Sequence, residues 1–142
     1  MQKANKFFLS VLICLILFVS QIGTLPGKAS PTGTIYLVSP TGSTNDICGS
    51  ESEPCLTIQK AVNLASSGDF ILVATGTYST AANKPECKSF TSELSIVCIV
   101  NKHLTVRGGY STSNWSISDP VANPTVIDGL NLYRGITLLG SS

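Results

Sequence analysis

Gly68-Asp69-Phe70-Ile71-Leu72-Val73-Ala74-Thr75-Gly76-Thr77-Tyr78 is the stretch of this 142-residue chain that decides the fold. Its apolar centre, Phe70–Ala74, is too short for a helix of normal length and lies between two glycines that favour turns. Ile71, Leu72 and Val73 form an unbroken apolar run, which indicates burial on both faces or a parallel sheet. The stretch therefore predicts a short, buried β-strand.

Short strands of the same kind are expected on both sides of this stretch. Gly108, Gly129 and Gly140 stand where the chain is expected to leave a strand and turn a corner, because glycine tolerates a positive φ. The pattern Ser39–Ser43 predicts a turn after the first strand. The expected strands are Ile35–Val38, Phe70–Ala74, Leu94–Val100, His103–Arg107, Thr125–Ile127 and Ile136–Leu139.

One short helix is expected between the first two strands. Thr57 can serve as its N-cap, and Gly68 ends it. The apolar residues that recur at helical spacing are Ile58, Ala61, Val62 and Ala65. This is the one helix that the sequence predicts after residue 29.

Four stretches together resemble the opening of secreted right-handed parallel β-helix proteins of the pectin-lyase-like group. They are Ile35–Ser43, Cys55–Val62, Gly68–Tyr78 and Leu104–Tyr110. The resemblance implies an all-β fold: a right-handed parallel β-helix (solenoid) start with one short N-terminal capping helix. It makes residues 35–142 the N-terminal cap and first coils, cut short at the C-terminus, with further coils needed at that edge. It also implies that Ser79–Glu93 is a projecting loop.

The first 29 residues predict export. Lys3 and Lys6 precede the apolar run Phe7–Val19, and as a helix that run covers roughly 20 Å, short of the roughly 30 Å of a bilayer core. Small residues follow, so we expect a signal peptide, residues 1–29, that is cleaved after Ala29. The alternative is an uncleaved anchor, which would be the chain's one membrane contact. Residues 30–34 are expected to be a linker in a secreted or cell-surface protein.

Cysteine usage agrees with an oxidising compartment, because Cys48, Cys55, Cys87 and Cys98 form an even set after the signal. Three pairings can be drawn, and the local one, Cys48 with Cys55 and Cys87 with Cys98, closes two short loops. The rival interpretation is a metal site, but neither spacing gives the close pairs of zinc-binding motifs. Disulfides are therefore the prediction.

Charge excludes a nucleic-acid surface. Once Lys3, Lys6 and Lys28 are removed with the signal, six dispersed basic residues remain against eight acidic ones, a net charge of −2. No catalytic constellation, cofactor site or metal-ligand set can be assembled. Asp69 and Asp128 are more simply turn residues beside glycine, His103 a structural histidine, and Arg107 a solvent-facing side chain.

Tyr110 and Trp115 are the candidate surface contact, since Tyr110 precedes and Trp115 lies within the polar stretch Ser111–Pro120, and aromatic rings can stack on sugars. The sequence thus favours a secreted or cell-surface β-helix protein with an adhesive, structural or carbohydrate-binding role, whose partner is a polysaccharide or another surface ligand. Two alternatives stay open. One is the N-terminal fragment of a pectin-lyase-like polysaccharide lyase or hydrolase, and the other is a small, self-sufficient disulfide-stapled secreted domain.

Overall fold

The structure, a computed structural model, describes residues 32–79, 87–88 and 94–140. The predicted signal peptide and the first two residues of the predicted linker, Ser30 and Pro31, lie outside these residues. The described part is mostly β with one short helix. In chain order its elements are β1 (Ile35–Ser43), α2 (Ile58–Leu64), β2 (Phe70–Ala74), β3 (Gly76–Tyr78), β4 (Cys87–Lys88), β5 (Leu94–Val100), β6 (Thr105–Tyr110), β7 (Thr125–Ile127) and β8 (Arg134–Leu139).

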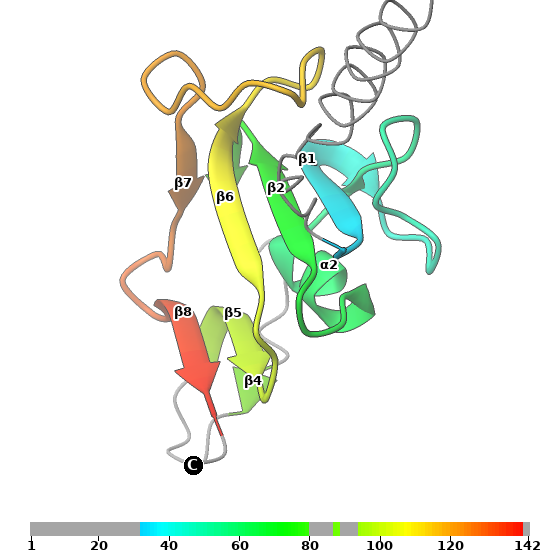
Figure 1. Cartoon of the computed structure of the whole chain (residues 1–142). Coiled ribbons are helices and arrows are strands. Elements are labelled where there is room, and N and C mark those ends of the chain that lie inside the picture. Colours follow the sequence, from blue (N-terminus) through cyan, green and yellow to red (C-terminus); the bar gives the residue numbers. More distant parts are fainter. Residues whose placement is uncertain (1–31, 80–86, 89–93, 141–142) are drawn as a thin grey trace, which may run out of the picture. The chain divides into compact units, whose positions relative to one another are not determined.

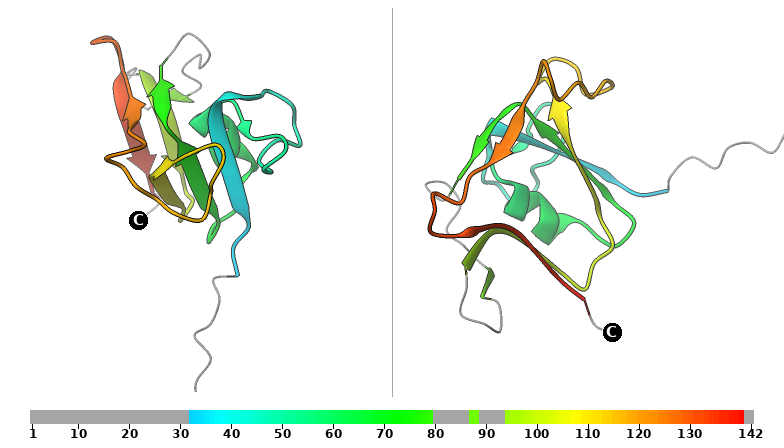
Figure 2. Two further views of the ribbon diagram at one scale, coloured as in Figure 1. Left: turned by 90° about the horizontal axis from the view of Figure 1, so that it is seen from above. Right: turned by 90° about the vertical axis from the view of Figure 1, so that its left-hand side faces the viewer.

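Within the described residues the strands form three short sheets, ordered β1-β2-β6, β3-β7 and β4-β5-β8. Pairing is parallel throughout except between β4 and β5, which are antiparallel. The first sheet stacks Ile35, Phe70 and Thr105 as partners, and its strands lie side by side in Figure 1. The chain visits the three sheets in the same order twice, and Figure 2 shows them around one interior that α2 also borders.

The core lies between the sheets and the helix. Its fully buried large side chains come from β1, α2, β2 and β5, and they are Val38, Ile58, Ile71, Val73, Ile96 and Val97. Parallel strands buried in this way have continuous apolar sequences, because both faces of the sheet contact other protein groups. The predicted strand Phe70–Ala74 is confirmed at its stated bounds and lies at the centre of the first sheet.

Asp69 explains the polar start of that strand. Its carboxylate accepts the backbone N–H of Thr34 at 2.8 Å and the N–H of Ser66 at 2.7 Å, and the residue is 7% exposed. One side chain thereby joins the start of β1, the end of the α2 region and the start of β2. The buried carboxylate is satisfied by these donors, as buried polar groups must be.

The predicted helix and its Thr57 N-cap are confirmed, but the helix ends at Leu64, with Ala65 as its C-cap, rather than at Gly68. Thr57 is extended at φ −128° and its hydroxyl accepts the Lys60 N–H at 3.0 Å. At the other end Lys102 donates from Nζ to Val62 O at 2.8 Å and to Ala65 O at 2.7 Å. The ammonium thus satisfies the terminal carbonyls of the helix, where a positive charge is favourable.

Gln59 of α2 closes one edge of β5. Its amide oxygen accepts the Cys98 N–H at 2.6 Å, and its amide nitrogen donates to the Cys98 carbonyl at 3.1 Å. These are the two bonds that a neighbouring strand would make with Cys98, and Gln59 is 8% exposed. On the side of β5 that faces away from β8, β4 therefore pairs with the start of the strand and the helix covers it at Cys98.

We expect Gln59→Leu to lower the free energy of unfolding by about 1–3 kcal/mol, because it leaves the buried N–H and C=O of Cys98 without partners. Urea denaturation followed by circular dichroism measures the change. Lys60→Leu on the same helix removes only a surface ion pair with Asp46 and should unfold close to the unsubstituted protein. Equal midpoints for the two variants would contradict the role given to Gln59.

Several bounds predicted from the sequence are wrong. The expected turn Ser39–Ser43 is instead the second half of β1, held extended by backbone bonds from Ser43 N to Pro54 O at 2.7 Å and from Leu56 N to Ser43 O at 2.8 Å. β8 begins at Arg134 rather than Ile136. The predicted loop Ser79–Glu93 contains β4, and its remaining residues after Ser79 lie outside the described part.

The chain was predicted to leave a strand at Gly108, and this is wrong. Gly108 and Gly109 lie inside β6, which runs from Thr105 to Tyr110. Gly109 has a φ of +88°, and a Cβ there would lie 2.9 Å from Pro120 N. The pairing of β2 with β6 shifts register beside it. The glycine thus permits a bulge and a close approach of the following loop.

Candidate functional site

The side of the structure formed by β6, β7 and β8 is the candidate site, and we call it the open face. Each of these strands is the last of its sheet in the described part of the chain, and the right-hand view of Figure 2 looks onto them with α2 behind. Partly exposed apolar side chains project here, with Ile136 48% and Leu138 71% exposed. The others are Leu104, Val106, Ile127 and Tyr133, which also contact the core.

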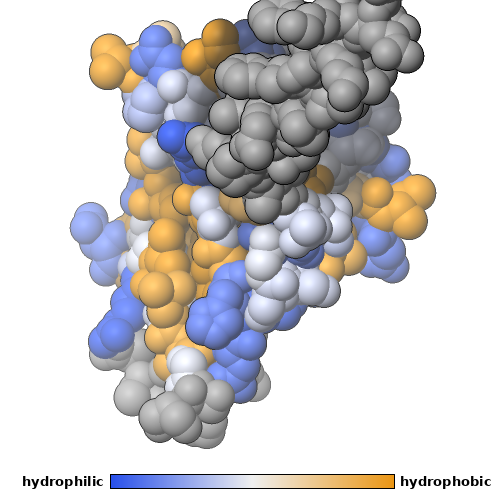
Figure 3. All heavy atoms as spheres, viewed as in Figure 1, coloured by the Kyte–Doolittle hydropathy of each residue, from blue (hydrophilic) through white to orange (hydrophobic). Residues whose placement is uncertain are grey.

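Figure 3 shows apolar side chains gathered in a band over these strands. In β5 the corresponding positions are buried: Val97 and Ile99, the partners of Ile136 and Leu138, are 1% and 7% exposed. Ile136 and Leu138 of β8 occupy the same register as this buried pair of β5, but no strand or helix of the described residues covers them. The open face is therefore a core-like surface in contact with solvent.

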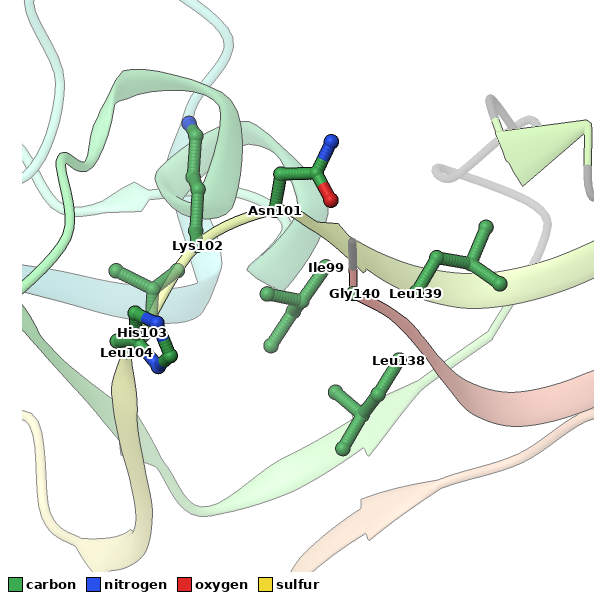
Figure 4. A pocket seen from close by; sticks show the side chains of 8 residues that line it. All are labelled: Ile99, Asn101, Lys102, His103, Leu104, Leu138, Leu139 and Gly140. Carbon is green, nitrogen blue, oxygen red and sulfur yellow. The ribbon is translucent and has the colours of Figure 1, made fainter. Parts of the chain in front are cut away.

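A cavity of about 370 Å³ opens at one corner of this face. Figure 4 shows Ile99 and Leu138 on its apolar side, with His103 at the rim and the Lys102 side chain turned away toward α2. Because Lys102 Nζ already bonds the carbonyls of α2, its charge is not directed into the cavity. The residues that line it are Ile99, Asn101, Lys102, His103, Leu104, Leu138, Leu139 and Gly140.

This lining suits burial of apolar groups. It contains no carboxylate, whereas glycoside hydrolysis uses a pair of them roughly 5–10 Å apart. His103 is exposed at the rim, and the described residues contain no group of three His, Cys, Asp or Glu side chains that could hold a metal ion. What the cavity offers is space beside leucine and isoleucine side chains.

Tyr110 and Trp115 lie together, at the end of β6 and in the loop that follows. Their ring centroids are 6.2 Å apart and their planes make an angle of 27°. Tyr110 is 4% exposed, so its own ring offers almost no surface, and the indole of Trp115 is stacked beside it. Trp115 is half-buried and is the member of the pair that a ligand could reach.

The disulfide predicted between Cys48 and Cys55 is confirmed, with both residues almost fully buried. Cys98 is also disulfide-bonded. Its predicted pairing with Cys87 stays a prediction, since the Cys87 side chain lies outside the described part. The described cysteines are therefore structural rather than metal-binding.

The remaining residues singled out from the sequence are separate from one another. Asp128 accepts the Leu130 N–H at 2.8 Å in the corner between β7 and β8. Arg107 is exposed on β6. The structure brings neither of them together with Asp69, which is occupied by its own backbone donors.

Two pKa shifts accompany the structural contacts. Burial raises the pKa of Tyr78, whose hydroxyl donates to Ala74 O at 3.1 Å, so the phenol stays protonated. The hydrogen bond and charge of Lys60 lower the pKa of the exposed Asp46 carboxyl. Both groups hold local structure, and neither lines the cavity.

Sequence reasoning missed Gln59, which bonds α2 to β5, and Lys102, which bonds the last carbonyls of the α2 region. An amide in the apolar half of a helix was the one signal for Gln59, because such a group must find a buried partner. No sequence pattern indicated the role of Lys102, since the carbonyl groups that it bonds lie 37 to 40 residues earlier in the chain.

Comparison with known proteins gives a family but no function. Residues 41–130 match the model of a family described as "Protein of unknown function (DUF1565)". No curated protein matches the chain, and no solved structure does. In the part of the chain that the structure describes, no helix has the length and hydrophobicity needed to span a membrane. Since the matched segment covers more than half of the sequence, the chain belongs to the DUF1565 family of proteins of unknown function.

Proposed function

We propose that this chain is the N-terminal cap and first coil of an exported right-handed parallel β-helix, with a structural or adhesive role at the cell surface. Parallel pairing in the order β1-β2-β6, β3-β7 and β5-β8 supports the coil. Parallel strands joined by crossovers are right-handed in almost all proteins, which favours that hand here. The partner of the open face is then a further β-helix coil.

The contrast between the two ends carries the proposal. At one end the loop after β1 bonds its outer edge, with Leu37 N donating to Gly49 O at 2.8 Å, and Gln59 occupies the edge of β5. At the other end Ile136 and Leu138 are exposed beside strand edges. A solenoid start needs this asymmetry, because its first coil must be capped while its last edge accepts a strand.

Export is the second part of the proposal. It rests on the predicted signal, residues 1–29, and is supported by the buried Cys48–Cys55 disulfide, since such bonds persist in oxidising compartments. The product that leaves the cell begins at Ser30. Its proposed role outside the cell is to display a surface.

The open face is tested by sedimentation of the exported chain. We expect the unsubstituted protein to self-associate at micromolar concentrations, because no further β-helix coil is present to pair with its open face. The double variant Ile136→Lys/Leu138→Lys should sediment as a monomer with an unchanged circular dichroism spectrum. N-terminal sequencing of the same material reports whether Ser30 is the first residue.

The matched control is Ile47→Lys/Val121→Lys. These residues are 82% and 94% exposed, more than Ile136 and Leu138, but neither belongs to the open face. The control should associate as the unsubstituted protein does. A monomeric unsubstituted protein with cooperative unfolding would overturn the proposal in favour of a self-sufficient small domain.

A further inference from the structure

The loop Ser111–Asn123 between β6 and β7 is held in one arrangement by its own hydrogen bonds. Ser118 Oγ donates to Gly108 O at 2.9 Å and Asp119 N to Gly109 O at 2.7 Å, which ties the loop back to β6. Near its tip, Ser116 N donates to the Asn114 side-chain oxygen at 2.9 Å. A loop that is ordered before binding loses little conformational entropy when a ligand arrives.

Trp115 is the large side chain of this loop, and it is supported by a neighbouring ring as well as partly exposed. Its indole stacks on the ring of Tyr110, at 6.2 Å between centroids, and Tyr110 is itself buried. The ring therefore has a fixed support on one side and contact with solvent elsewhere. Rigid aromatic anchors of this kind supply contact area at low entropic cost.

The chemistry around Trp115 is polar but uncharged. Tyr110–Ser118 contains no Asp, Glu, Lys, Arg or His. Thr112, Ser113, Asn114 and Ser116 are exposed and carry hydroxyl or amide groups that both donate and accept hydrogen bonds. An acidic polymer would favour arginine or lysine partners, and none is present in this segment.

We propose that Trp115 and the polar residues Thr112–Ser116 bind a neutral polysaccharide, with one sugar ring stacked on the indole. A pyranose ring has an apolar face for the aromatic surface and hydroxyls at its edge for Ser, Thr and Asn. The ligand class deepens the adhesive role proposed above and rests on it for the location at the cell surface. It does not depend on the exposed apolar side chains of the open face, because the ring of Tyr110 is buried and Trp115 lies in the loop that follows β6.

Trp115 is the only tryptophan in the chain, so intrinsic tryptophan fluorescence reports on this site alone. We expect a saturable change in emission when the exported protein is titrated with a neutral soluble polymer, tested as laminarin, galactomannan and arabinoxylan. Polygalacturonate, an acidic polymer, should produce no saturable change. A response to polygalacturonate alone would overturn the neutral ligand class.

Affinity electrophoresis in gels that contain the responding polymer tests the residue. Trp115→Ala should weaken retardation by about tenfold or more, as loss of a central aromatic anchor does. Trp115→Phe keeps a ring over Tyr110 and should retain part of the affinity, which separates lost contact from a disturbed loop. Val121→Ala, on the same loop and 94% exposed, should migrate as the unsubstituted protein does.

The outcomes separate this site from the rest of the proposed function. Equal retardation of Trp115→Ala and the unsubstituted protein, or no response to any neutral polymer, overturns the polysaccharide site and leaves the sedimentation result unaffected. If only the Ile136→Lys/Leu138→Lys variant lost retardation, binding would lie on the open face, and the polysaccharide site at Trp115 would be overturned as well. Binding to cell envelopes that survives periodate oxidation of sugars but not protease treatment would identify a protein partner instead.

Discussion

Replacing Ile71 by alanine is expected to lower the free energy of unfolding by about 2–5 kcal/mol, which is a large part of the stability of a small domain. Ile71 is 0% exposed and is the central member of a stack, with Tyr36 as its partner on β1 and Val106 on β6. Its removal leaves a cavity between three strands that cannot close without moving a sheet. Urea denaturation at low protein concentration measures the loss.

Val126→Ala is the matched control for this change. It removes a smaller part of a β-branched side chain from β7, at a position that is 47% exposed, and surface changes of this kind usually alter stability by less than about 1 kcal/mol. If Ile71→Ala unfolded at the same urea concentration as Val126→Ala, the first sheet would not be the core that holds the strands together.

The fold was predictable where side chains alone decide it. The strands Leu94–Val100 and Thr125–Ile127 occur at their predicted bounds, and the helix begins after Thr57 as expected. In these segments apolar periodicity and a capping hydroxyl act within a few residues of each other, so one sequence window contains the whole signal. The parallel sheets follow from unbroken apolar runs in strands buried on both faces.

Contacts between distant segments were not predictable. β1 continues through Pro40 because Cys55 and its neighbours, which lie 11 or more residues later in the chain, pair with the strand. Glycine was expected to supply the positive φ at the corner after β7, but Leu130 and Asn131 adopt it, at 54° and 57°. Asp128 favours this turn by accepting the Leu130 N–H, and a turn of this kind has no fixed glycine position.

The candidate site was likewise predictable only in part. The aromatic pair was predictable as a unit because Tyr110 and Trp115 are close in sequence, but which ring is exposed depends on how the loop returns to Gly109. The apolar strand at Ile136–Leu139 was predictable, and its exposure follows from the order of the sheets. Burial is a property of the neighbours of a strand, and these are set by the topology.

Removing the Cys48–Cys55 disulfide is expected to have a double effect. The bond closes a loop with a sequence separation of 7, and loop closure of that size corresponds to about 2–3 kcal/mol of stability. The same loop supplies the backbone partners of β1, including Gly49 O for Leu37 N and Pro54 O for Ser43 N. Cys48→Ala/Cys55→Ala should therefore destabilise the protein and also uncover the outer edge of β1.

The second effect distinguishes a loop that protects the edge of β1 from a disulfide that only adds stability. In the background Ile136→Lys/Leu138→Lys, where the open face no longer associates, the added cysteine changes should restore self-association, because β1 then offers a free edge at the opposite end. Sedimentation of the fourfold variant in oxidising buffer measures this while the disulfide of Cys98 stays intact. A monomeric fourfold variant with lowered stability would mean that the loop stays on β1 without its disulfide. The backbone bonds from Leu37 and Ser43, rather than the covalent link, would then be what closes this end of the fold.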